Sequence, residues 1–65
     1  MNTLRKQRKC LGMTQHDLSR ATGIIPSRIA FFETGRRQLT DREIARIKKA
    51  LARRAAKVAA IAAIS

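Results

Sequence analysis

Aromatic residues, acidic residues and cysteine are scarce in this sequence of 65 residues. It has no Trp or Tyr, two Phe and a single cysteine, Cys10, which excludes an internal disulfide and fits a reducing compartment. We expect Cys10 to be a half-buried small apolar residue. His16 is the only histidine and has no ligand partners at metal-binding spacing. Because no catalytic triad, paired carboxylates or phosphate-binding loop is recognisable either, we expect no enzyme, no metal and no cofactor.

Long hydrophobic runs are also absent. The longest uninterrupted apolar run covers residues 58–64, far short of the roughly 20 residues that a membrane-spanning helix needs. The basic start of the chain is not followed by the apolar stretch that a signal peptide has. We therefore expect a cytoplasmic protein without a membrane partner.

Basic charge is what the sequence has in excess. It contains 15 Lys and Arg against 4 Asp and Glu, which gives a net charge of +11. Such an excess predicts a polyanionic partner, and nucleic acid is the usual one. The length permits one domain with a small core. Because helix-forming residues dominate and no segment alternates apolar and polar residues, we expect an all-α fold.

Residues 14–35 are predicted to form two short helices joined by a tight turn. Thr14 and Asp17 have the spacing of a capping box, which begins a helix. Gly23 ends that helix, because glycine tolerates the left-handed conformation that a sharp turn needs. Pro26 begins the second helix, since its fixed φ suits a first helical turn.

Two further helices are predicted on either side of this pair. Residues 3–11 form the first, which ends at Gly12. Thr40 and Glu43 form a second capping box that opens the last helix. From residue 50 the sequence is rich in Ala, so this helix either continues or breaks near Arg54 into a short fifth helix.

This order of residues resembles the helix-turn-helix of the Cro/repressor-type (xenobiotic-response-element, XRE) family of bacterial and phage regulators. The matching residues, which extend upstream to Arg8 and Gly12, are Thr14, Gln15, Leu18, Gly23, Ile29, Phe32, Glu33 and Gly35. The resemblance covers residues 3–54. It implies a lambda-repressor-like fold of four or five helices, with a DNA-binding domain over residues 1–54 and an Ala-rich helical extension over residues 55–65.

Several positions depart from the family pattern, and two of them lie in or beside the turn between the paired helices. Ile25 stands where Ser or Thr normally caps the recognition helix, and Pro26 compensates by removing one unpaired N–H. Thr22 stands where an apolar residue is usual, which lowers the apolarity of the core.

The resemblance also implies which residues contact double-stranded DNA. Those expected to face bases are Pro26, Ser27, Arg28 and Phe31. Those expected to bind phosphates are Gln15, Arg36 and Arg37. Arg28 is the sharpest candidate, because an arginine can bind guanine O6 and N7 with two hydrogen bonds. Phe31 has two alternatives, a contact with a thymine methyl or cover for a hydrophobic gap on the protein.

A structural ion pair is a further implication of the resemblance. In relatives, an arginine at the position of Arg8 pairs with a glutamate at the position of Glu33. An Arg8–Glu33 bridge would tie the first helix to the recognition helix. The alternative is two independent surface charges.

The C-terminal segment is predicted to form an interface. The apolar stripe of the last helix continues past the small core through Val58, Ile61 and Ala62, and exposed apolar surface of this kind usually marks a contact. We expect a homodimer contact, with a frayed tail as the alternative.

The function expected from these features is that of a sequence-specific DNA-binding transcriptional regulator. It would act as a repressor, associated with the nucleoid, and would bind an inverted repeat as a homodimer. The alternative is an antitoxin whose apolar C-terminus binds a toxin. A basic amphipathic peptide that binds RNA or a membrane surface would leave the helix-turn-helix pattern unexplained.

Overall fold

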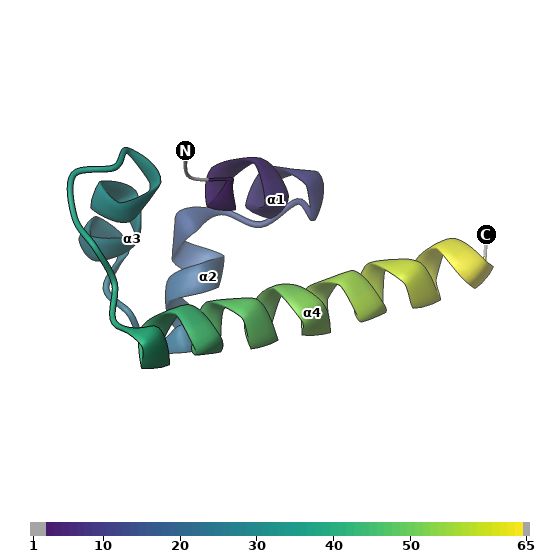
Figure 1. Ribbon diagram of the computed structural model, residues 1–65. Helices are drawn as coiled ribbons and strands as arrows, with labels where there is room; N and C mark the ends of the chain where they lie inside the picture. Colours follow the sequence, from purple (N-terminus) through teal and green to yellow (C-terminus); the bar gives the residue numbers. More distant parts are fainter. Residues whose placement is uncertain (1–2, 65) are drawn as a thin grey trace.

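The structure is a computed structural model that describes residues 3–64 of the chain. Within that range it contains four α-helices and no strand (Figure 1). The helices are α1 (Leu4–Cys10), α2 (Gln15–Thr22), α3 (Pro26–Glu33) and α4 (Asp41–Ile64). The prediction of a small all-α fold is therefore confirmed.

Both predicted capping boxes are present, and they explain where α2 and α4 begin. The Asp17 N–H donates to Thr14 Oγ1 at 3.0 Å, and the Thr14 N–H donates to Asp17 Oδ2 at 2.9 Å. The corresponding distances for Thr40 and Glu43 are 3.1 Å and 2.9 Å. Gly23 ends α2 with a φ of +76°, in the left-handed region where a side chain would be strained.

The core lies where α2 packs against α3 and against the first half of α4. Each helix of the described range contributes at least one buried apolar side chain, and the turns between them contribute the others. The buried set is Leu4, Met13, Leu18, Ile24, Ile29, Leu39, Ile47 and Ala50. Such a small core leaves one face of every helix exposed, so the surface of α3 is free to take a functional role.

Thr22 is buried, and its hydroxyl is fully used by the turn after α2. Its Oγ1 donates to the Leu18 carbonyl oxygen at 2.7 Å and accepts the Ile24 N–H at 3.3 Å. The expected loss of core apolarity is thus offset by two hydrogen bonds within the helix-turn-helix.

The last helix is continuous. α4 passes Arg54 without a break and extends beyond the other helices, which gives the molecule extents of 40 × 19 × 18 Å (Figure 1). Arg54 Nε donates to the Leu11 carbonyl oxygen at 3.0 Å and so ties the end of α1 to the middle of α4. Cys10, at the end of α1, is exposed, so the expectation of a half-buried residue is wrong.

Candidate nucleic-acid interface

The outward face of α3 carries the residues expected to face bases. Ile29 is fully buried on the inner side of the helix, which fixes the direction of the opposite side. Ser27, Arg28 and Phe31 are exposed and lie on one face, because Phe31 follows Arg28 by three positions and Ser27 by four. Phe31 is a large apolar side chain with 41% of its surface exposed. Pro26 is half-buried in the first turn.

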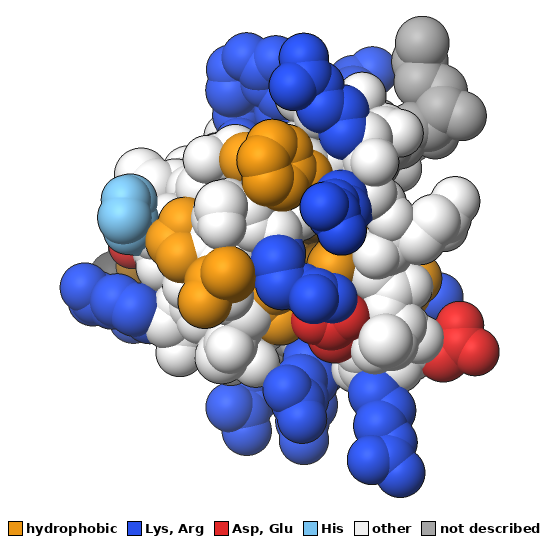
Figure 2. Space-filling view, turned by 90° about the vertical axis from the view of Figure 1, so that its left-hand side faces the viewer, with side chains coloured by type: hydrophobic (Ala, Val, Ile, Leu, Met, Phe, Trp, Pro, Cys, Tyr) orange, Lys and Arg blue, Asp and Glu red, His pale blue; other side chains and the backbone are white. Residues whose placement is uncertain are grey.

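This face lies within basic surface. Figure 2 views the α3 side of the molecule and shows Lys and Arg side chains around a small group of hydrophobic side chains, with few acidic ones. Arg36 and Arg37 are exposed in the loop that follows α3. Ile25, just before α3, is also exposed and apolar. The family pattern marks Ile25 only as a missing cap, and the sequence does not distinguish it from its neighbour Ile24, which is buried.

Behind this face, an ion pair connects α1 to α3. Arg8 Nε donates to Glu33 Oε2 at 2.8 Å and Arg8 Nη2 donates to Glu33 Oε1 at 3.0 Å. The two side chains are only 7% and 2% exposed. Arg8 Nη1 also donates to the Met13 carbonyl oxygen at 2.8 Å, so one guanidinium joins α1, the turn before α2 and α3.

The pKa values of this pair move in the directions that stabilise both charges. Burial opposes ionisation of the Glu33 carboxyl, but hydrogen bonds from Arg8 and Gln15 outweigh it and leave the pKa of Glu33 below its usual value. The hydrogen bond to Glu33 raises the pKa of Arg8. The pair is therefore fully ionised at neutral pH.

Gln15 joins the same network. Its Nε2 donates to Glu33 Oε1 at 3.2 Å from the first turn of α2. The side chain expected to bind phosphate is thus held against the end of α3. One of its two amide hydrogens is engaged with Glu33, which leaves the second for another acceptor.

Arg28 also has a partner within the protein. Its Nη2 donates to Glu43 Oε1 at 2.7 Å, a contact between α3 and the first turn of α4. The sequence indicates only a capping role for Glu43, because nothing in it sets the register between these two helices.

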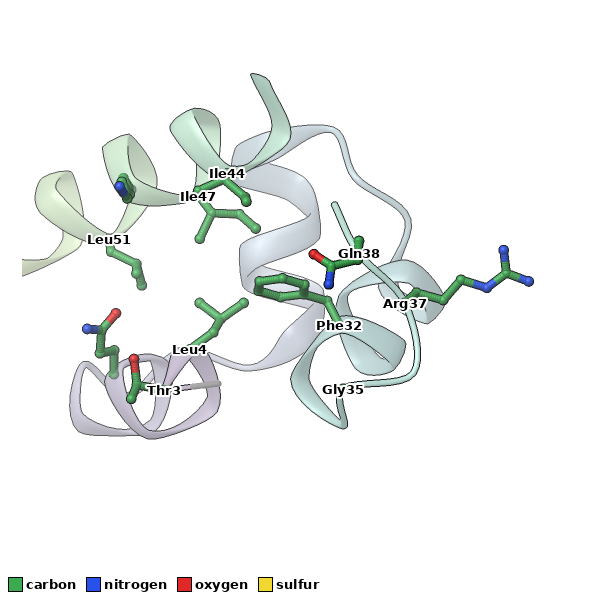
Figure 3. Close-up of a pocket in the computed structure, with 11 residues that line it drawn as sticks. Thr3, Leu4, Phe32, Gly35, Arg37, Gln38, Ile44, Ile47 and Leu51 are labelled. Atoms are coloured by element: carbon green, nitrogen blue, oxygen red, sulfur yellow. The ribbon is translucent and has the colours of Figure 1, made fainter. Parts of the chain in front are cut away.

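A cleft of about 450 Å³ lies between α1, the end of α3 and α4. Figure 3 shows the Phe32 ring turned into this cleft towards Leu4 and Ile47. Arg37 contributes to the wall, but its guanidinium points away from the cleft (Figure 3). The Arg37 side chain is therefore exposed to solvent.

The C-terminal half of α4 carries the residues expected to form a dimer. Val58 and Ile61 are 40% and 60% exposed, and Ala62 is exposed as well. Their spacing places them along one side of the helix. Beyond residue 54, none of the described side chains through residue 63 is buried.

Residues 3–64 contain no group of three or more His, Cys, Asp and Glu that could hold a metal ion. In the same range, no helix combines the length and the hydropathy needed to cross a bilayer.

The fold and the exposed face of α3 define a helix-turn-helix DNA-binding domain. The sequence model of the helix-turn-helix family of the Cro/C1 (XRE) type matches residues 4–58. The chain belongs to this family of DNA-binding transcription regulators, and its fold is the small lambda-repressor-like one. Neither the curated proteins nor the solved structures gave a match to the chain.

Proposed function

We propose that this protein is a sequence-specific transcriptional repressor that binds double-stranded DNA as a homodimer on an inverted repeat. Family membership supports DNA binding and regulation. The single observation that carries sequence specificity is the outward face of α3, where Ser27, Arg28 and Phe31 are exposed while Ile29 is locked in the core. A helix presented in this way fits the major groove with its N-terminus first.

Each residue of this face has a chemistry that suits base edges. The Arg28 fork fits guanine O6 and N7, a contact worth about 1–3 kcal/mol of discrimination. The exposed ring of Phe31 suits a thymine methyl, and its exposure favours this role over cover for a gap in the protein. Pro26 and Ser27 lie at the end of α3 that enters the groove first.

Phosphate contacts are proposed for residues at the edges of the same face. Gln15 lies at the N-terminus of α2, where the helix dipole and the free N–H groups favour an anion. Arg36 and Arg37 are exposed in the loop after α3. Such contacts supply affinity that falls steeply as salt rises, and they do not depend on base sequence.

The homodimer is proposed from the exposed stripe of Val58, Ile61 and Ala62. Residues 58–63 carry no charge, although the chain as a whole has a net charge of +11. This segment is therefore the part of the surface that least repels a second copy. A two-fold dimer would place two recognition helices on half-sites about 34 Å apart, and repression in the cytoplasm would follow from covering a promoter on the nucleoid.

The same exposed stripe favours a second candidate function, in which the protein is an antitoxin and the stripe covers a toxin. The mass of the isolated protein in solution separates the two. A dimer that is lost in Ile61→Glu and retained in Ala60→Glu, which adds the same charge outside the stripe, supports the repressor. A monomeric wild-type protein supports a stripe reserved for another protein.

Selection of duplexes from a random DNA library at about 0.15 M salt tests the proposed function, because non-specific binding is weak there. An enriched inverted repeat is the expected result. An enriched single half-site would support sequence-specific binding but would contradict binding as a homodimer. No enrichment over random DNA would contradict sequence-specific binding altogether.

A further inference from the structure

The Glu43 carboxylate accepts hydrogen bonds from two groups, the cap of its own helix and an arginine of α3. Its Oε1 accepts the Thr40 N–H at 2.9 Å, while its own N–H donates to Thr40 Oγ1 at 3.1 Å. The same Oε1 accepts Arg28 Nη2 at 2.7 Å. The pKa of Glu43 is lowered, first by the hydrogen bond from the Thr40 backbone, so the carboxyl is ionised at neutral pH. The capping box thus fixes a negative charge at the start of α4, facing α3.

The two members of this pair differ in exposure. The Arg28 side chain is 48% exposed and the Glu43 side chain is 17% exposed. Glu43 is therefore the more enclosed member of the pair, and about half of the Arg28 side chain remains open to solvent. A guanidinium has five N–H donors, and the contact with Glu43 uses Nη2 only. Enough donors remain for the two hydrogen bonds that a guanine edge accepts.

We propose that Glu43 is a positioning residue that determines base specificity by holding Arg28 in the orientation that reads guanine. An arginine that is ordered before binding loses less side-chain freedom in the complex. It also offers its fork in one direction, so a different base pair at that position is penalised more strongly. This inference rests on the proposed base contact of Arg28.

The chain offers variants that separate this role from helix capping. Glu43→Gln keeps an amide oxygen that can accept the Thr40 N–H, because Glu and Gln both serve in a capping box. It removes the charge that Arg28 faces. Asp41→Asn is the matched control, since it removes the same charge from the same first turn of α4. Thermal unfolding of both variants shows whether each remains folded at the assay temperature.

The experiment measures dissociation constants of the full chain for a selected duplex and for duplexes with one altered base pair. The base pair read by Arg28 is the one at which Arg28→Ala loses discrimination. At that pair, Glu43→Gln is expected to lower discrimination about 3- to 10-fold, in the range of a weakened charge-assisted contact. At the other base pairs, Glu43→Gln should discriminate as well as the wild-type protein does. Asp41→Asn should discriminate like the wild-type protein at every base pair.

Two further readouts decide the result. In an Arg28→Ala background, Glu43→Gln should have no additional effect on discrimination, which a purely structural role would not predict. The inference is overturned if Glu43→Gln behaves like Asp41→Asn, or if it tightens binding to every duplex, which would mean that Glu43 competes with DNA. If Arg28→Ala itself shows no dependence on base pair, the proposed role of Arg28 fails, and this inference fails with it.

Discussion

Replacing Glu33 by Gln should destabilise the fold strongly, because it breaks the buried ion pair with Arg8. The substitution keeps the size of the side chain but leaves Arg8, whose side chain is 7% exposed, opposite a neutral amide. Removing one partner of a buried ion pair costs about 3–5 kcal/mol, because the remaining charge stays buried without compensation. We expect the free energy of unfolding to fall by about 3 kcal/mol, at the lower end of this range, because Arg8 keeps its hydrogen bond to the Met13 carbonyl.

That loss is large for a chain of this length. Stability of about 0.05–0.15 kcal/mol per residue gives roughly 3–10 kcal/mol for 65 residues. At about 4–8 °C per kcal/mol, the thermal midpoint of Glu33→Gln should fall by about 12–24 °C. Circular dichroism at 222 nm and pH 7, without DNA, measures this midpoint.

Two companion variants test the reasoning behind this magnitude. Asp41→Asn removes an exposed carboxylate and should leave the midpoint nearly unchanged. The pair Arg8→Met with Glu33→Leu removes both charges and should be more stable than Glu33→Gln alone, because no charge is then buried without a partner. A fall of less than about 3 °C for Glu33→Gln would refute the view that this pair holds α1 to α3.

Three other predictions concern affinity, pH and capping. Arg37→Ala should weaken binding to selected and random duplexes by the same factor and lower the salt slope by about 1, and unequal losses would contradict a phosphate contact. The pKa values of Glu33 and of the two capping carboxylates are lowered, so their stabilisation is complete above about pH 4.5 and is lost as pH falls through the lower folded values. The thermal midpoint should be level from about pH 5 to 7 and fall at lower pH, whereas a constant midpoint down to about pH 2 would oppose this assignment. Thr14→Ala and Thr40→Ala should each lower the free energy of unfolding in urea by about 1 kcal/mol, and an unchanged urea midpoint would mean that the caps contribute nothing.

Local signals in the sequence predicted the helix-turn-helix well. Thr14 and Asp17 are three residues apart, and so are Thr40 and Glu43, so each capping box depends only on neighbouring residues. Gly23 acts in the same local way at the end of α2. The limits of α2 and the first turn of α4 were predictable for that reason.

Contacts between distant residues depended on other information. Arg8 and Glu33 are 25 residues apart in the sequence, and only the family resemblance predicted their ion pair. In the structure, Arg8 Nε lies 2.8 Å from Glu33 Oε2. The Arg28–Glu43 contact was not predicted, because spacing along the chain does not set the register between α3 and α4. The exposure of Cys10 was missed for a similar reason, since two faces of a short helix are hard to distinguish without its neighbours.

The continuity of α4 was one of two open alternatives. The Ala-rich sequence around Arg54 favours helix, and the hydrogen bond from Arg54 to the Leu11 carbonyl holds this part of α4 against α1. The sequence contains no proline or glycine after residue 35 that would break the helix. What the exposed stripe beyond Arg54 contacts depends on a second molecule, so neither the periodicity nor the fold of one chain determines it.

The proposed function requires that the exposed face of α2 and α3 reads DNA. Amide chemical shifts in the nitrogen-15 NMR spectrum, followed during titration with a selected duplex, test this requirement most directly. At about 0.15 M salt, the largest shifts should fall at residues 14–16, 27–31 and 35–38, with small shifts along the second half of α4. Shifts concentrated in residues 46–63 would instead show that the basic last helix binds DNA. That result would contradict sequence reading by α3.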